Sequence, residues 1–310
     1  MPLARAILRA LTSPRGLWAA VGCVAVALGL WSARLAFELV QADRPAEPPP
    51  AAPLPLVAAR DGALSLRLAG SGSNVAGLRQ VVLACQRQGQ ALSLQVEPGI
   101  GSAGGLRALR DGAIDAALVS RHLAAGELQG TEVQTVYARA PVTFAAARRD
   151  VAGVDGLALL AALSAAAPRW PDGRPLTWLL REPGDSGHRV VAQNHSAFAA
   201  LEARARRDPA AQVYFHDRTL HAALVGAEAA VGLVDATAVR AEGLPLSLST
   251  WGGATPDAAT VQAGAWPHVK PHSLVYPIGA APRLQALLAC LGSPAGREAL
   301  VRLGAAPTLP

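Results

Sequence analysis

The chain has 310 residues, of which 51% are hydrophobic and 16% are charged, a balance that excludes an intrinsically disordered protein. Its net charge of +6 arises without a dense run of lysine or arginine, and aromatic residues make up only 4% of the chain. The sequence therefore does not indicate a nucleic-acid binder. A modest positive balance suits a small anionic ligand equally well.

The N-terminal segment predicts export. Arginines precede an uncharged run of 18 residues, 16–33, which is at the lower limit for a membrane span and longer than a usual signal-peptide core. By the positive-inside rule, residues 1–15 lie in the cytoplasm and the main body lies outside. We expect residues 16–37 to be an uncleaved anchor, with a cleaved signal peptide as the alternative. The proline-rich residues 38–60 are expected to form an extended linker.

From residue 61 to residue 310, short apolar runs alternate with helical patterns. Strands are expected at 64–69, 92–97, 114–119, 132–137, 142–147, 176–180, 213–215, 231–234, 246–248 and 273–276. Helices are expected at 75–87, 104–110, 156–166, 187–207, 220–229, 282–292 and 294–303. This alternation predicts an α/β fold with mainly parallel sheets.

The chain has three cysteines. Cys23 lies in the apolar N-terminal run, and Cys85 and Cys290 each lie in an apolar helical pattern. The ordinary interpretation of Cys85 and Cys290 is two buried free thiols. The alternative is a disulfide between them, which would form in an oxidising compartment. No cysteine and histidine spacing indicates a metal site, and no cofactor is expected.

Four junctions carry the candidate chemistry. Three have a strand, a glycine- and serine-rich loop and a helix start, at 70–74, 99–105 and 181–188; the fourth is Ser120-Arg121, after a strand. Helix N-termini offer unpaired N–H groups and a positive dipole end, serine hydroxyls add donors, and arginine forms a fork for an oxyanion. Because ligands bind beyond the carboxyl ends of strands in open α/β sheets, these loops predict an oxyanion site.

Taken singly, each loop has other interpretations. Residues 99–104 match a dinucleotide-binding pattern, but no acidic residue ends a strand about 20 residues later. Residues 184–187, Gly-Asp-Ser-Gly, resemble the nucleophile loop of trypsin-like proteases, but the α/β alternation is wrong for a double β-barrel. Glycine turns that merely cap helices also remain open.

The order of these motifs resembles the periplasmic phosphate-binding proteins of ABC importers, within the type II periplasmic binding proteins. The runs LRLAGSGSNVAGLRQVV, VEPGIGSAGGLRALRDGAIDAALVSRHLAAGEL and LLREPGDSGHRVVAQ carry the resemblance, which covers nearly all of 64–306. It implies two α/β lobes joined by strand crossovers that close on the ligand at a hinge. Lobe 1 is expected at about 61–140 and 245–310, and lobe 2 at about 141–244.

The resemblance also implies a set of ligand-binding residues. These are Ser71, Ser73, Asn74, Gly101, Ser102, Ser120, Arg121, Arg181, Asp185, Ser186, Gly187 and His188. The chain departs from the family where His188 and Asn74 replace threonine, and where an acidic residue near Ser120 is absent. Such an acceptor favours protonated phosphate over sulfate, and Asp185 is a candidate to replace it. His188 either faces the ligand, which would make binding pH-dependent, or only begins a helix.

The expected function is capture of inorganic phosphate for an ABC-type importer, without catalysis. The expected partners are phosphate or a similar oxyanion, a transporter permease and the membrane, with the domain held in the periplasm. Other oxyanions, namely molybdate, tungstate and sulfate, stay open as ligands. So do an enzyme, either phosphatase-like or a serine hydrolase that uses Ser186, and a sensor or assembly protein with a degenerate site.

Overall fold

The computed structural model describes residues 64–310 except Pro98 and residues 149–152. The predicted cytoplasmic segment 1–15, anchor 16–37 and linker 38–60 lie outside the described residues. Among the helices of the described part, none has the length and apolar character that a bilayer crossing needs.

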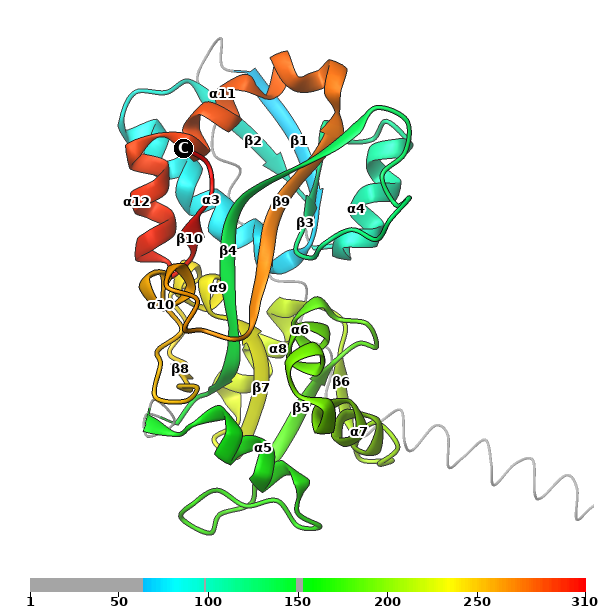
Figure 1. The fold of residues 1–310 in the computed structure, drawn as a ribbon, viewed down its shortest axis with the longest axis vertical. Helices are drawn as coiled ribbons and strands as arrows, with labels where there is room; N and C mark the ends of the chain where they lie inside the picture. Colours follow the sequence, from blue (N-terminus) through cyan, green and yellow to red (C-terminus); the bar gives the residue numbers. More distant parts are fainter. Residues whose placement is uncertain (1–63, 98, 149–152) are drawn as a thin grey trace, which may run out of the picture. The chain divides into compact units, whose positions relative to one another are not determined.

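Strands and helices alternate along most of the described chain, which confirms the α/β class (Figure 1). The strands are β1 (Leu64–Gly70), β2 (Leu92–Val96), β3 (Ala116–Val119), β4 (Glu132–Ala146), β5 (Thr177–Arg181), β6 (Gln212–Tyr214), β7 (Ala230–Asp235), β8 (Ser247–Leu248), β9 (Val269–Pro277) and β10 (Ala306–Pro307). The helices are α3 (Gly72–Arg87), α4 (Gly101–Arg110), α5 (Gly156–Ser164), α6 (Ser186–Asn194), α7 (Ser196–Ala205), α8 (Asp217–Gly226), α9 (Ala236–Ala241), α10 (Ala258–Gln262), α11 (Ala281–Gly292) and α12 (Pro294–Arg302), with a 3₁₀ turn η2 (Ile278–Ala280).

The strands of the described residues pair in the order β2-β1-β3-β9-β4-β7-β5-β6, and β8 and β10 pair with β4. Strand β1 is parallel to β2 and β3, and β5 is parallel to β6 and β7. The long strands β4 and β9 are antiparallel to each other and to their other neighbours. The sheet is therefore mixed rather than mainly parallel, because the two strands that cross between the lobes run in opposite directions.

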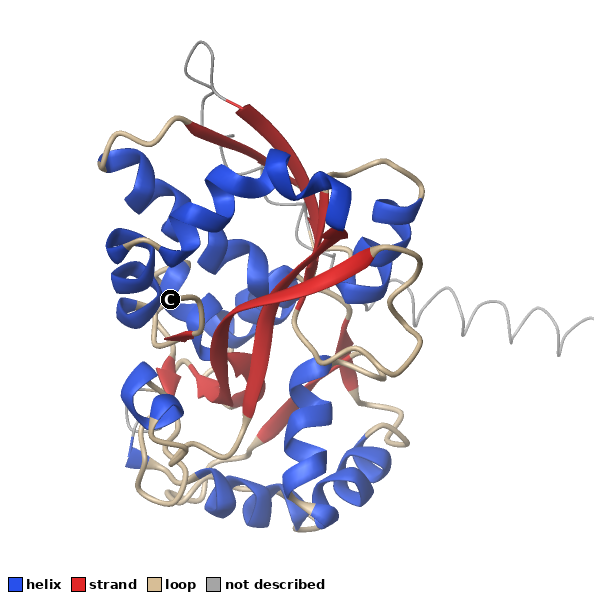
Figure 2. Cartoon of the chain, turned by 45° about the horizontal axis from the view of Figure 1, so that its top comes forward, coloured by secondary structure: helices blue, strands red, loops and turns tan. Residues whose placement is uncertain are grey.

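Each lobe has a large hydrophobic core of its own, accompanied by a smaller cluster. Tyr137 on β4 packs in the core of lobe 1, whereas Phe144 on the same strand packs in the core of lobe 2. Figure 2 shows β4 and β9 as the long strands that run from one group of helices to the other. Trp251 and Trp266 are buried in the second core, so lobe 2 extends beyond the expected boundary at 244. These large aromatic side chains gain the most from burial, and the chain returns to lobe 1 only along β9.

Two other expectations need correction. The helix expected at 187–207 is two helices, α6 and α7, because His195 between them has an extended backbone with φ −135° and ψ 101°. The strands expected at 132–137 and 142–147 are one strand, β4, which continues through Pro141. The short elements α9, α10 and β10 were not expected from the sequence.

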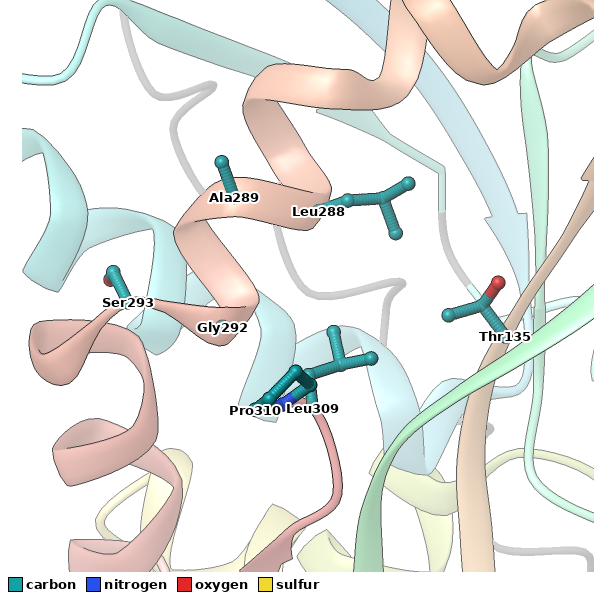
Figure 3. A pocket seen from close by; sticks show the side chains of 7 residues that line it. All are labelled: Thr135, Leu288, Ala289, Gly292, Ser293, Leu309 and Pro310. Atoms are coloured by element: carbon teal, nitrogen blue, oxygen red, sulfur yellow. The ribbon is translucent and has the colours of Figure 1, made fainter.

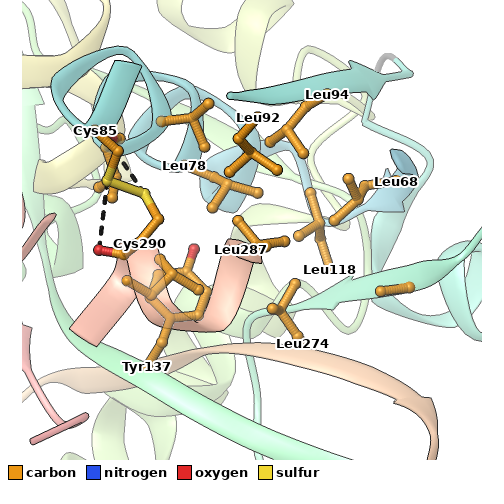
Figure 4. Packing of buried hydrophobic residues seen from close by; sticks show 14 of the residues in the cluster. Leu68, Leu78, Cys85, Leu92, Leu94, Leu118, Tyr137, Leu274, Leu287 and Cys290 are labelled. Atoms are coloured by element: carbon orange, nitrogen blue, oxygen red, sulfur yellow. Dashed lines mark hydrogen bonds between the residues drawn. A yellow bond between two sulfur atoms is a disulfide. The ribbon is translucent and has the colours of Figure 1, made fainter. Parts of the chain in front are cut away.

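Cys85 on α3 and Cys290 on α11 form a disulfide across 205 positions of sequence (Figure 4). Both residues are fully buried in the core of lobe 1, together with Leu78 and Leu287. The interpretation as two free buried thiols is therefore wrong. A structural disulfide is typical of proteins in an oxidising compartment.

Candidate functional site

The predicted loops stand at the starts of three helices. Helix α3 follows β1 directly, α4 begins at Gly101 and α6 begins at Ser186, close after the end of β5. The first two loops touch through their backbones, since a Cβ on Gly99 would lie 2.6 Å from the Cα of Gly72. Only glycine permits this approach, so the glycines bring the starts of α3 and α4 together.

Four serines from three segments meet at these helix starts, and we call them the serine cluster: Ser71, Ser73, Ser102 and Ser120. The Ser73 hydroxyl lies 3.2 Å from that of Ser71 and 3.5 Å from that of Ser120. The backbone N–H of Ser120 donates to the Ser102 hydroxyl at 3.2 Å. Ser71, Ser73 and Ser120 are buried and Ser102 is partly buried. The structure thus brings together four of the predicted ligand residues.

Lys270 contacts the serine cluster and was not among the predicted residues. It lies on β9, is 3% exposed, and its ammonium donates to Ser73 Oγ at 2.9 Å. It is the only lysine of the chain, and it lies in the buried stretch 270–276 of its strand. Its being the single lysine of the sequence is the signal that could have found it, because lysine is seldom buried unless its ammonium is paired.

Asp235, at the end of β7, balances this buried cation. Its Oδ2 lies 3.2 Å from Lys270 Nζ and 2.8 Å from His272 Nε2. Its Oδ1 accepts the N–H groups of Thr237 and Ala238 and so begins α9. Burial alone would raise the pKa of Asp235, but Lys270 and His272 outweigh it and lower that pKa. Among the described residues no cluster of three or more metal-ligating side chains is present.

Arg121 does not extend toward the serine cluster with a free guanidinium. Both of its terminal nitrogens bond to the carboxylate of Glu127, six residues along the same loop, one of them at 2.7 Å. This pairing lowers the pKa of Glu127 to about 2. The structure therefore gives Arg121 a loop-bracing role.

Arg181, which is 5% exposed, is surrounded by carboxylates. Its Nε donates to Glu182 at 2.8 Å, its Nη1 bonds to Asp217, and Asp185 Oδ2 lies 3.9 Å away. Burial would lower the pKa of Arg181, but the three carboxylates together raise it. Asp217 begins α8 in lobe 2 and also touches α3 of lobe 1, since a Cβ on Gly72 would lie 2.5 Å from its Oδ2. Arg181 thus holds an inter-lobe contact.

The start of α6 is arranged differently from the expectation. Asp185 Oδ1 accepts the N–H groups of Gly187 at 2.9 Å and His188 at 3.1 Å. The carboxylate therefore takes up the two amides that were expected to bind a ligand. Ser186 is the first residue of α6 and is partly buried.

His188 lies in the core of lobe 2. Its ring stacks on Trp178 with centroids 5.8 Å apart, its Nδ1 lies 2.9 Å from Glu202, and it is 2% exposed. The structure therefore favours the interpretation of His188 as a packed helix-start residue over a ligand contact. Because it is buried against lobe 2, it is not brought to the serine cluster.

Asn74 and Gly101 complete the predicted set. The Asn74 side chain is fully buried and accepts a hydrogen bond from Tyr137 while its amide donates to the carbonyls of Val119 and Ser273. These contacts join α3 to β3, β4 and β9, which is a structural role. Gly101 is exposed and has a φ of +73° at the start of α4, a conformation that favours glycine.

A hollow of about 400 Å³ lies elsewhere in lobe 1, among the C-terminal segments (Figure 3). Its lining is Thr135, Leu288, Ala289, Gly292, Ser293, Leu309 and Pro310. None of these residues belongs to the predicted site, and the lining carries no charged side chain. The hollow is therefore distinct from the serine cluster.

A family model for a PBP superfamily domain matches residues 57–277, which is most of the chain. The chain belongs to the PBP superfamily. The two lobes, the crossing strands and the helix starts at the lobe junction agree with that membership, and the resemblance predicted from the motifs is confirmed. No curated protein matches the chain by sequence.

Solved structures share the fold of this superfamily member at low identity. A protein from Clostridium perfringens, described as a phosphate ABC transporter substrate-binding protein with bound phosphate, is 17% identical with a TM-score of 0.62 over 79% of this chain and 99% of its own. An ABC-type phosphate transport receptor from Vibrio cholerae is 17% identical with a TM-score of 0.51 over 78% of this chain and 99% of its own. A reduced form of OxyR from N. meningitidis is 14% identical, with a TM-score of 0.53 over 79% of this chain and 99% of its own. At these identities the likeness shows the fold alone.

Proposed function

We propose that this domain binds a small tetrahedral oxyanion, phosphate first among them, as the solute-binding component of an ABC-type importer outside the cytoplasmic membrane. The observation that carries the proposal is the serine cluster with Lys270 beside it, since Lys270 Nζ lies 2.9 Å from Ser73 Oγ. Hydroxyl donors and a buried cation are the groups that replace the hydration shell of an oxyanion. The family match and the likeness to a phosphate-bound protein agree with it.

Binding requires no bond to be made or broken. The ligand oxygens accept from the hydroxyls of Ser73, Ser102 and Ser120 and from N–H groups at the start of α4. These donors are held by the close packing of the loops, so little reorganisation is needed when the ligand enters. Ser186, at the start of α6, supplies a donor from lobe 2.

Asp185 bears on which oxyanion is preferred. Its carboxylate lies between Arg181 and the start of α6, and Lys270 on β9 helps to lower its pKa. A carboxylate facing a bound ligand repels fully ionised sulfate and accepts a hydrogen bond from protonated phosphate. We therefore rank phosphate ahead of sulfate, molybdate and tungstate.

Two observations support the proposed location. The disulfide between Cys85 and Cys290 supports an oxidising compartment. The charge asymmetry around residues 16–37 favours export with an N-terminal tether, and a permease is then the partner that receives the ligand.

A melting panel of the full-length protein in detergent tests the proposal. Phosphate at 1,000 times its Kd stabilises the native state by about 4 kcal/mol and so raises the melting temperature by several degrees. Sulfate, molybdate and tungstate at equal concentration show the preference. If no oxyanion raises the melting temperature, the proposal is wrong and a sensor or assembly role is favoured.

A charge-introducing variant locates the site. Ser102→Asp places a carboxylate next to Ser120, and like-charge contact should reduce phosphate affinity by at least about 100-fold in calorimetry. Ser196→Asp is the matched control, because Ser196 is an exposed residue at the start of α7 that receives the same charge. Unchanged affinity in Ser102→Asp would remove the serine cluster from the site.

A further inference from the structure

We propose that Lys270 is the cation that contacts the bound oxyanion, in place of the arginines that the motifs indicate. The inference rests on the proposed oxyanion-binding function and adds its charge-supplying residue.

The two candidate arginines are neutralised by their own neighbours. Arg121 makes a two-pronged contact with Glu127. Arg181 bonds to both Glu182 and Asp217. A guanidinium whose donors already face carboxylates has little net charge to offer an anion.

Lys270 is less fully committed. An ammonium has three protons, and among the described residues the acceptors within hydrogen-bond distance are Ser73 Oγ and Asp235 Oδ2. Asp235 is itself shared with His272 and with two backbone N–H groups of α9. Its negative charge is therefore spread over several donors, and the third proton of Lys270 is available to a ligand.

Lys270 also sets the polarity of the serine cluster. Because Ser73 Oγ accepts a hydrogen bond from Lys270, its own hydroxyl proton must point away from Lys270, toward Ser71, Ser120 or a ligand. The cluster then presents donors rather than acceptors. Donors backed by a cation select a ligand whose oxygens only accept, which is an anion rather than a neutral sugar or amide.

The position of Lys270 lets it act on both lobes. Strand β9 carries it across the junction, Ser73 lies on α3 of lobe 1, and Asp235 ends β7 of lobe 2. Its charge also helps to lower the pKa of Asp185 at the start of α6, against the effect of burial. A ligand held between α3 and α6 therefore lies within reach of Lys270.

Because Lys270 is the only lysine, isotope labelling reports on it alone. We would label the full-length protein with lysine carrying ¹³C at Cε and titrate it with inorganic phosphate. The expected result is one side-chain signal that shifts with the Kd that calorimetry measures. A signal that does not move while calorimetry shows phosphate binding would overturn the inference.

Substitutions distinguish direct contact between Lys270 and the ligand from a general effect of losing one positive charge. Lys270→Met should lose about 10- to 100-fold of phosphate affinity, as for removal of a charged hydrogen-bond donor, and Lys270→Arg should lose less. Arg302→Gln is the control for loss of one positive charge, because Arg302 is exposed on α12. Melting temperatures without ligand show whether each variant is folded.

A double variant decides the mechanism. Lys270→Met with Asp235→Asn removes both charges and keeps a side chain that can begin α9. If Lys270 contacts the ligand, the double variant stays as weak as Lys270→Met. Wild-type affinity in either variant overturns the inference and leaves the proposed function intact, whereas absence of phosphate binding by the unaltered protein overturns both.

Discussion

His268 is a buried histidine whose ring nitrogen Nε2 lies 3.1 Å from that of His195. Burial, with a smaller effect from His195, lowers the pKa of His268 from 6.5 to about 3. The unfolded chain takes up a proton below pH 6.5, whereas the folded chain resists it until about pH 3. Burial of the neutral His268 ring therefore costs no folding stability above pH 6.5. As the pH falls below 6.5, proton uptake by the unfolded chain progressively lowers the free energy of unfolding.

We predict that the free energy of unfolding decreases by up to about 1.4 kcal/mol for each pH unit below 6.5 because of this residue. Urea unfolding at pH 7.5 and 5.5 measures the decrease. His268→Gln, which cannot titrate, is the control and should lose less stability over the same interval. An equal decrease in the two proteins would contradict the assignment.

At the same scale, four of the residues that the sequence singled out lie close together in the structure. Ser71, Ser73, Ser102 and Ser120 meet because each follows a strand at the same edge of the sheet. The roles of the charged residues could not be predicted. Lys270 meets Ser73 from 197 positions away, and Arg181 meets Asp217 from 36 positions away, and no local pattern encodes such pairings.

At the scale of elements, the disulfide fastens α3 to α11. We predict that Cys85→Ala with Cys290→Ala lowers the free energy of unfolding by about 2–4 kcal/mol, chiefly because the unfolded chain regains freedom. Denaturant unfolding measures this loss. A reducing agent should produce a similar loss in the unaltered protein and none in the variant; equal stability of both proteins without reductant would argue against the bond.

The elements themselves follow the sequence closely where they are long and periodic, as α3 and β1 do. Departures occur where tertiary packing decides. Residues 187–207 carry a continuous helical pattern, yet the chain turns at His195, whose ring contacts Trp251 at 4.8 Å between centroids. Strand β4 continues through Pro141 because residues on either side of Pro141 pack into different cores.

At the scale of the whole described domain, the two lobes touch at Gly72 and Asp217. Asp217 is held in place by Arg181, so it cannot easily move aside for a larger residue. A Cβ at position 72 would lie 2.5 Å from the Asp217 carboxylate. This contact keeps α3 and α8 close to each other.

We predict that Gly72→Ala disfavours this arrangement by about 1–3 kcal/mol, the usual cost of overpacking. Phosphate affinity should then fall about 10-fold or more, because the binding arrangement is less populated. Calorimetry measures the phosphate affinity of the variant. Small-angle scattering measures the wider separation of its lobes. Gly226→Ala, where nothing lies within 4 Å of the added Cβ, is the control. Equal affinity in both variants would show that the contact does not limit binding.

The sequence by itself determined the α/β class, the loops that begin α3, α4 and α6, and membership of the binding-protein family. These depend on residue periodicity, glycine and serine placement and motif order, which are local properties. Only the tertiary structure decided the mixed sheet, the disulfide, the burial of His188 and the pairing of Arg121, Arg181 and Lys270. Each of these depends on which distant side chain is nearest, and burial makes that choice of partner energetically decisive.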